Sequence, residues 1–344
     1  MMTSYLLRRI NLLLVTLFIL TIASYALAYL FPGEALQNLS GQLNPNDTTY
    51  AALSEKYAMD AHPIFGFFTY LGHLLHGDWG TSINSGKPVL DEILSHLPAT
   101  LELSTYALFM SLLIGIPVGF WAGIRFHRSV DYVVMTGSVV GFSIPVFWLA
   151  LILIMLFSLN LGLLPMSGRI SLLFDIPERS GFIVLDILLS DIPNKREALY
   201  NAFLHMILPT LSITIVTSAV VMRITRRSVA DVIQSDYIKA AIARGLSRTQ
   251  ALWRHGVRNA LLPIMPQIVM QFTVLLTNAM IVELIFSWPG IGNWLLQAIY
   301  QRDYPAISGG MLAVSAVVIF FTLTMDVLVR ALNPLKRRDV HGTI

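Results

Sequence analysis

Six long stretches without a charged residue constrain most strongly how this chain can fold. They cover residues 10–33, 103–124, 132–168, 198–222, 259–282 and 304–325. A membrane-spanning helix needs about 20 mostly apolar residues, so each stretch can hold one helix, and 132–168 can hold a helix and a loop. Only 12% of the 344 residues are charged, which is about half the usual share in soluble proteins. The sequence therefore predicts an all-α polytopic membrane protein with six transmembrane helices, and it excludes a soluble enzyme.

The basic residues predict an orientation, because Lys and Arg accumulate in the cytoplasmic segments of membrane proteins. Residues 223–258 contain eight of them, whereas residues 32–97 contain only Lys56 and Lys87 beside seven acidic residues. We therefore expect both termini in the cytoplasm. In the alternative interpretation, Ala26-Leu27-Ala28 is a signal-peptidase site, and cleavage there would leave five spans. The first apolar stretch is long for a signal sequence, which favours a retained anchor helix.

Four regions follow from this pattern. We expect an N-terminal transmembrane anchor helix over 1–31, a polar external segment over 32–97, a membrane core over 98–332 and a cytoplasmic tail over 333–344. The long inside loop of the core covers 229–258. On the second span Gly115, Gly119 and Gly123 recur every four residues, a spacing that permits close helix approach. Packing within the fold is the simplest interpretation of these glycines.

Catalytic and metal-binding patterns are weak in this chain. It has no cysteine, and therefore no thiolate site. Residues 80–88, G-T-S-I-N-S-G-K-P, differ from a phosphate loop in glycine spacing and in having Pro88 where a hydroxyl is required. His73 and His76 stand three apart without the pattern of a zinc enzyme. We predict no catalytic residue, no metal and no cofactor in this chain, and the small net charge of +3 gives no reason to expect nucleic acid as a partner.

The inside loop has the helix signals of an ordered segment. Ser235 is a suitable N-cap for a helix that begins at Asp236, and Gly245 is a natural stop. Ser247 and Gln250 have the spacing of a capping box that starts a second helix toward Asn259. Two short helices joined at a glycine would form a projection that exposes Tyr237, Ile238, Ala241 and Leu246. Such a projection fits a groove in a cytosolic partner, although the basic residues alone would also suit anionic lipid headgroups.

Residues 236–247, D-Y-I-K-A-A-I-A-R-G-L-S, followed by Arg254-His255 and by R-N-A-L-L-P at 258–263, resemble the EAA coupling loop of ABC-importer permeases. Nearly the whole chain resembles the dipeptide/oligopeptide/nickel permease family. The motifs that carry this resemblance are G-D-W-G at 77–80, G-F-S-I-P-V-F-W at 141–148, H-M-I-L-P at 205–209, F-S-W-P-G at 286–290 and R-D-Y-P at 302–305. Residues 163–169, L-L-P-M-S-G-R, and the ending Asn333-Pro334 look most like the antimicrobial-peptide/putrescine branch.

The resemblance implies a type I ABC importer permease fold in the bacterial inner membrane. It implies a homologous second permease, two cytosolic ABC ATPase subunits that bind ATP and Mg, a periplasmic substrate-binding protein and membrane lipid as partners. The implied substrate is a peptide or a similar small cationic solute. Two departures stand out. Lys239 replaces the glutamate that names the coupling motif, and Pro32-Gly33-Glu34-Ala35 lacks the aspartate and second proline found in many relatives.

The site residues expected from the resemblance form two groups. The ATPase-coupling group is Asp236, Tyr237, Ile238, Lys239, Ala240, Ala241, Arg244, Gly245, Leu246, Arg254, Asn259 and Pro263. The external group, which could contact substrate or binding protein or could simply anchor turns at the membrane interface, is Asp78, Trp288, Pro289, Gly290, Arg302, Asp303 and Tyr304. Three alternatives remain: an ABC-dependent exporter of a polyamine or peptide, an intramembrane enzyme, and a stand-alone channel or secondary carrier that works without an ATPase.

Overall fold

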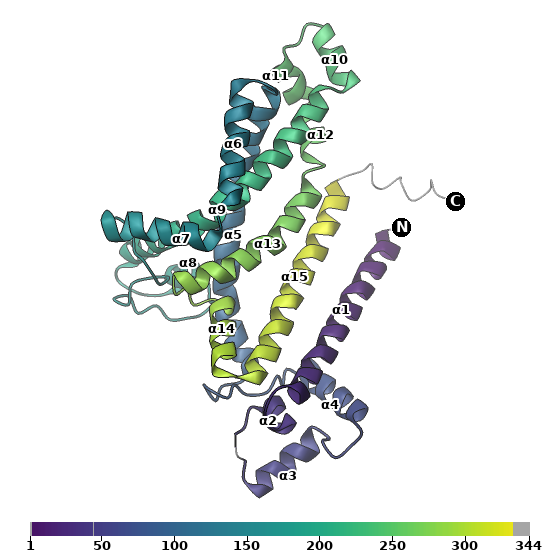
Figure 1. The fold of residues 1–344 in the computed structure, drawn as a ribbon, viewed down its shortest axis with the longest axis vertical. Coiled ribbons are helices and arrows are strands. Elements are labelled where there is room, and N and C mark those ends of the chain that lie inside the picture. Colours follow the sequence, from purple (N-terminus) through teal and green to yellow (C-terminus); the bar gives the residue numbers. More distant parts are fainter. Residues whose placement is uncertain (1, 44, 333–344) are drawn as a thin grey trace. The chain divides into compact units, whose positions relative to one another are not determined.

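The computed structural model describes residues 2–43 and 45–332, and within these ranges every long element is a helix (Figure 1). The α-helices are α1 (Met2–Leu30), α2 (Ala35–Ser40), α3 (Asp47–Lys56), α4 (Pro63–Leu75), α5 (Val89–Ile124), α6 (Ser129–Ser143), α7 (Val146–Leu153), α8 (Ile183–Leu189), α9 (Lys195–Ile233), α10 (Asp236–Ala243), α11 (Arg248–Ala251), α12 (Val257–Leu261), α13 (Met265–Ile285), α14 (Ile291–Gln301) and α15 (Tyr304–Leu332). Two π-helical segments are η1 (Ile154–Asn160) and η2 (Leu252–Gly256). The predicted tail, with Pro334, lies outside the described residues.

The membrane-spanning helices agree with the six charge-free stretches. Among the described residues, five helices are long and apolar enough to cross a membrane: Ile10–Leu30, Val89–Ile124, Lys195–Ile233, Met265–Ile285 and Tyr304–Val327. A sixth span is obtained when α6 and the helix over Val146–Asn160 are counted as one broken span. The prediction of an all-α membrane protein is confirmed.

The third span is bent, and this was not expected. Its two parts, Ser129–Ser143 and Val146–Asn160, meet at an angle of 95°, whereas the sequence suggested one helix followed by a loop. The break falls at Ile144, whose backbone is extended (φ −83°, ψ 122°) because Pro145 follows it. Pro209 lies inside α9 without ending that helix, so a proline alone does not decide where a span breaks.

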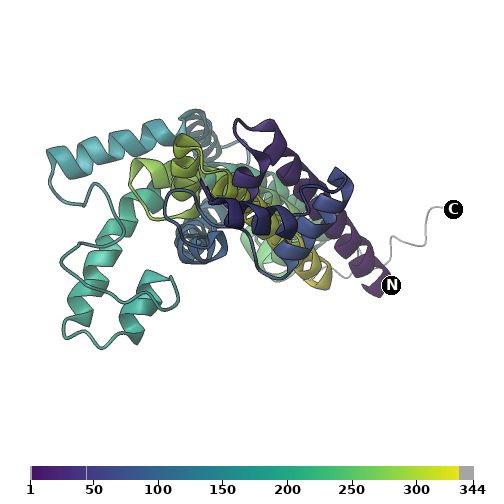
Figure 2. The same cartoon turned by 90° about the horizontal axis from the view of Figure 1, so that it is seen from below.

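One of two compact units contains residues 1–100, 177–186 and 289–323. In this unit α2, α3 and α4 gather around the end of α1 (Figures 1 and 2). Their common core is made by Tyr25, Leu36, Tyr57, Phe67 and Tyr70. The sequence predicted a polar external segment over 32–97, and it did not predict these three short helices.

Of the described residues, the other unit contains 101–176, 187–288 and 324–332. Here α9 is the central element, because α6, α7, α12 and α13 all pack against it. The three glycines of α5 face α9 as well. A Cβ atom on Gly119 would lie 2.6 Å from the Met222 carbonyl oxygen and 2.8 Å from the Thr225 Cβ. The glycine spacing therefore serves helix packing within the chain, as the sequence indicated.

We expect Gly119→Val to destabilise the protein, because the valine has no room between α5 and α9. Overpacking of this kind costs about 1–3 kcal/mol. The matched control is Gly137→Ala on α6, where a Cβ would meet no atom within 4 Å, and where alanine favours the helix by about 0.5–1 kcal/mol. Thermal unfolding in detergent should therefore separate the two variants. Equal unfolding temperatures would contradict the close α5–α9 contact.

Candidate functional site

The coupling segment predicted from the sequence begins where α9 ends. With 39 residues, α9 is about 58 Å long at 1.5 Å per residue, and this exceeds the roughly 30 Å thickness of the hydrocarbon layer. The charge-free part of α9 ends at Met222, so the charged turns after it are the part that extends past the hydrocarbon layer. Helices α10 and α11 follow at that end (top of Figure 1), and α10 packs against α9, α11 and η2.

Helix α10 has the predicted bounds, but its caps differ in detail. It begins at Asp236 directly after Ser235. The Ser235 hydroxyl donates to the Val232 carbonyl oxygen at 2.5 Å and makes no cap hydrogen bond to α10. After α10, Gly245 has a φ of +96°, a conformation that glycine adopts without strain. The glycine stop expected from the sequence is therefore present.

The second helix of the segment starts as predicted and then departs from regular geometry. Ser247 Oγ accepts from Gln250 N at 3.2 Å, and Ser247 N donates to Gln250 Oε1 at 3.0 Å, which completes the capping box. Instead of one α-helix toward Asn259, the chain forms α11, the π-helical η2 and α12. Segments of π-helix are frequent at functional sites.

The predicted exposure of one side chain of α10 is wrong. Ile238 was expected on the exposed face of α10, but its side chain is 0% exposed. Tyr237 is 44% exposed, while Ala241 and Leu246 are half-buried. An eight-residue helix that packs against three neighbours needs an apolar contact of its own, and Ile238 provides it. The remaining predicted residues of this group are exposed: Asp236, Lys239, Ala240, Arg244, Gly245, Arg254, Asn259 and Pro263.

Two hydrogen bonds and an apolar cluster hold the segment in place. Asn259 Nδ2 donates to Tyr237 Oη at 3.0 Å, which joins α12 to α10. Ser228 Oγ donates to the Ala260 carbonyl oxygen at 2.6 Å, which joins α9 to α12. Below them lies a buried cluster of Phe120, Val229, Leu252 and Ala260. The segment is therefore built onto α9 and α5 and is not a free linker.

The structure shows an ion pair near the same end of α9 that was not predicted from the sequence. Asp131 on α6 is 1% exposed and accepts from Arg226 Nε at 2.7 Å and from Arg226 Nη2 at 2.6 Å. Arg226 is one of the eight basic residues of 223–258, which by themselves would also suit lipid headgroups. No local pattern links two residues that are 95 positions apart, so only the packing of α6 on α9 reveals the pair.

In the external group, Asp303 and Trp288 are buried. Asp303 is 1% exposed and Trp288 is 0% exposed. The Asp303 carboxylate accepts from Ser82 Oγ at 2.6 Å, from Asn84 N at 3.2 Å and from Asn84 Nδ2 at 3.2 Å. These bonds fix the turn at 82–88 to the start of α15. The geometry thus assigns Asp303 an anchoring role and leaves little of its surface for a binding protein.

The other external residues differ in exposure. Pro289 and Arg302 are exposed, and Gly290 is buried. Arg302 follows α14 with a φ of +58°, and the Tyr304 ring stacks on Phe31 at a centroid distance of 4.5 Å. Of this external group, Pro289 and Arg302 are the residues that are exposed.

Asp78 forms an ion pair in the segment between α4 and α5. Its Oδ2 lies 2.6 Å from Lys56 Nζ and 3.4 Å from His73 Nδ1. Burial alone would raise the pKa of the Asp78 carboxyl, but the hydrogen bond and charge of Lys56 and the Gly80 N–H outweigh it and hold this pKa below its usual value. The second histidine of the candidate zinc pattern, His76, bonds instead to the Gly72 carbonyl oxygen at 2.7 Å.

The lowered pKa of Asp78 predicts a pH dependence. The carboxylate form is favoured by folding, so its contribution to stability is complete above the unfolded pKa of about 3.9 and is lost as the pH falls through the lower folded value. We expect the Gly80 amide to lose protection from hydrogen exchange at acid pH, and in Lys56→Met to lose part of it already at neutral pH. Unchanged protection in Lys56→Met would contradict this role of the pair.

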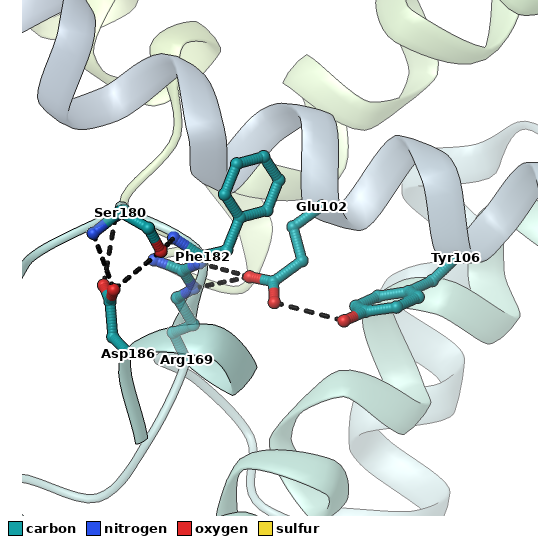
Figure 3. A network of polar contacts seen from close by, with 7 residues as sticks. Glu102, Tyr106, Arg169, Ser180, Phe182 and Asp186 are labelled. Atoms are coloured by element: carbon teal, nitrogen blue, oxygen red, sulfur yellow. Dashed lines mark hydrogen bonds and ion pairs between the residues drawn. The ribbon is translucent and has the colours of Figure 1, made fainter. Parts of the chain in front are cut away.

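A second buried ion pair involves the long segment between η1 and α8. Arg169 Nε donates to Glu102 Oε2 at 3.0 Å, and Tyr106 Oη donates to Glu102 Oε1 at 3.2 Å (Figure 3). The Arg169 guanidinium also lies 5.8 Å from the Trp288 ring centroid. Glu102, which is 2% exposed, is therefore neutralised by a partner. Figure 3 also shows the separate turn in which Ser180 N and Ser180 Oγ donate to Asp186 Oδ1, both at 2.7 Å.

Comparisons with known proteins agree on a family. Residues 115–338 match the family described as binding-protein-dependent transport system inner membrane component. The chain is 41% identical to the putrescine export system permease protein SapB of Escherichia coli K12, over 99% of both chains. It is 38% identical to the di/tripeptide transport system permease protein DppB of Pseudomonas aeruginosa, over 97% of this chain and 98% of that one.

A solved structure with a similar fold comes from the inward-facing MetNI methionine ABC transporter. The TM-score is 0.51 at 17% identity, and the match covers 72% of this chain and 98% of the other. At this identity the likeness concerns the fold alone, and it agrees with the fold expected from the sequence. The chain belongs to the family of inner-membrane components of binding-protein-dependent transport systems, as a permease subunit of an ABC transporter related to SapB and DppB.

Proposed function

We propose that this permease couples a cytosolic ATPase to solute movement through the segment from Asp236 to Leu246. Both termini and this segment lie in the cytoplasm in our proposal, and the segment over 32–97 lies outside. The excess of basic residues in 223–258 and of acidic residues in 32–97 supports this orientation.

The observation that carries the proposal is the construction of α10. It is a short helix at the end of a long rigid one, its inner side is held by the buried Ile238, and its outer side exposes Tyr237, Lys239 and Arg244. Docking a helix into a groove of a partner is a common mode of recognition. When closure of the ATPase moves its groove, a helix built onto α9 would move with it.

The complex that this role requires has several subunits. A homologous second permease would complete the path through the membrane, and two ABC ATPase subunits would bind ATP and Mg. A periplasmic binding protein would deliver the substrate to the external surface, where Pro289 and Arg302 are exposed. This chain itself contributes no cofactor site in the proposal.

We propose peptides or a small cationic solute as the substrate, with import as the direction. The name of the Pseudomonas aeruginosa relative refers to di- and tripeptides, and the family description refers to binding proteins, which fits uptake. Export is the second candidate, because the Escherichia coli K12 relative is named a putrescine export permease. Labelled putrescine and labelled trilysine, offered on either side of membrane vesicles, separate the two directions.

Co-purification tests the proposal. The chain, expressed at its natural level with an affinity tag and extracted in a mild detergent, should bring down a second permease and subunits that hydrolyse ATP. A chain that is isolated alone under conditions that preserve a known ABC transporter would contradict the proposal and favour a carrier that needs no ATPase.

A further inference from the structure

The Asp131–Arg226 ion pair has a geometry that fixes one helix to another. Two parallel hydrogen bonds join the guanidinium to the carboxylate, at 2.7 Å and 2.6 Å. A bidentate pair of this type restrains orientation as well as distance. With Asp131 1% exposed, the charges are largely withdrawn from water, so the separated charges would be costly.

The surroundings of the pair extend the restraint to the turn before α6. The backbone N–H of His127 donates to Asp131 Oδ2 at 2.9 Å, and the Arg226 guanidinium lies 4.3 Å from the Phe126 ring centroid. On α5, a Cβ at Gly123 would lie 2.8 Å from the Arg226 carbonyl oxygen. The ends of α5 and α6 are thus both fixed to the same turn of α9.

The position of the pair along the chain gives it mechanical importance. Arg226 and Asp236 are separated by the last turns of α9 and the single connection at Gln234-Ser235. On the other side, α6 runs from Asp131 to the 95° bend of the third span. Any displacement of α10 that moves the end of α9 is therefore applied to α6 at Asp131, because Arg226 lies about 10 Å along the helix axis from the end of α9 at Ile233.

We propose that Asp131 and Arg226 are positioning residues for transport, which make α6 and the end of α9 one lever between the coupling helix α10 and the bend at Pro145. This inference rests on the proposed function of α10. The bidentate pair fixes the orientation of the two helices at their contact, so that α6 and the end of α9 can move together as a rigid body. It acts through α9 and α6 and touches no substrate.

Spin labels can measure the rigidity of this lever directly. The chain has no cysteine, so cysteines introduced at Val133 on α6, which is 72% exposed, and at Ala243 on α10, which is exposed, can be labelled specifically. The label-to-label distance is measured in the whole complex without nucleotide and after trapping with ATP and vanadate. We expect the same distance in both states. A change between the states in the unmutated complex would overturn the proposal.

Variants of the pair then test whether the ion pair supplies the rigidity. Arg226→Lys keeps the charge but loses the bidentate geometry, and Asp131→Asn loses the charge. In both we expect the distance to shift on trapping or its distribution to broaden. The matched control is Arg128→Gln in the same turn, whose side chain is exposed, and it should behave like the unmutated chain. A distance that stays fixed in Arg226→Lys, with only a lower unfolding temperature, would reduce the pair to a structural role.

If the single variants fail to assemble into the complex, a double variant can still test the proposal. The double variant Asp131→Leu with Arg226→Met leaves no buried charge, and such replacements commonly preserve stability. A state-dependent distance in this double variant supports the proposal, and a fixed distance overturns it. A failure of the proposed function gives a different result from a failure of this inference. If the proposed function is wrong, no ATPase subunit co-purifies with the chain, and this is seen before any distance is measured.

Discussion

Replacing Gly245 by aspartate is expected to abolish transport while leaving the protein inserted in the membrane at its normal amount. The φ of +96° at this position disfavours any side chain, at a cost of about 1–3 kcal/mol for the strained backbone. A Cβ at Gly245 would meet no atom of the chain within 4 Å. The aspartate would therefore project from the end of α10 toward the proposed ATPase groove, and its charge is unfavourable at a helix C-terminus.

A matched substitution separates docking from backbone strain. Gly162 has a φ of +62° and also has no described neighbour within 4 Å, so Gly162→Asp places the same charged side chain on a positive-φ backbone at a site away from α10. We expect this control to keep transport. Uptake of labelled trilysine and putrescine into cells, with immunoblots of the membrane fraction, measures both variants. Normal transport by a well-expressed Gly245→Asp chain would contradict the proposed coupling role of α10.

Removing the Asp303 carboxylate is expected to release the turn at 82–88 from the start of α15. In Asp303→Ala, Ser82 Oγ and both Asn84 nitrogens lose their acceptor. Hydrogen bonds to a charged group contribute about 1.5–3 kcal/mol each, and a buried donor left without a partner is costly. The free energy of local opening should therefore fall by several kcal/mol.

Hydrogen exchange at the Asn84 amide, together with proteolysis within 82–88, would detect this release. The control is Glu55→Gln, which alters an exposed carboxylate of α3 and should leave both measurements unchanged. If the Asn84 amide of Asp303→Ala exchanges as slowly as in the unmutated chain, Asp303 is not the anchor of this turn.

The sequence predicted the spans well because burial of a charge in hydrocarbon is so costly that charge-free stretches mark helices. It predicted the glycine stop of α10 and the capping box at the start of α11 because these signals depend on neighbouring residues only. The sequence did not predict the features that depend on tertiary packing. Helix α4 is apolar but only 13 residues long, too short for a span and hidden between turn signals, and so it was missed.

The candidate site shows the same division between local and distant information. A helix start and stop can be predicted from neighbouring residues, but which side of α10 faces inward depends on α9 and η2, and this is why Ile238 was assigned to the wrong side. Asp131 looked like the flank of a span, because its partner Arg226 is far away in the sequence. For Asp303 the sequence left both a contact role and an anchoring role open, and it could not name the partner Ser82, which lies 221 positions before it.

Cross-linking from α10 tests the central claim most directly. A photoreactive benzophenone amino acid is placed at Lys239 and, as the control, at Thr48 of α3; both side chains are exposed. Irradiation of intact cells should join the Lys239 position to an ABC ATPase subunit, identified by mass spectrometry, and should give no such product from the Thr48 position. Absence of the ATPase adduct at Lys239, in a complex that hydrolyses ATP, would contradict the account.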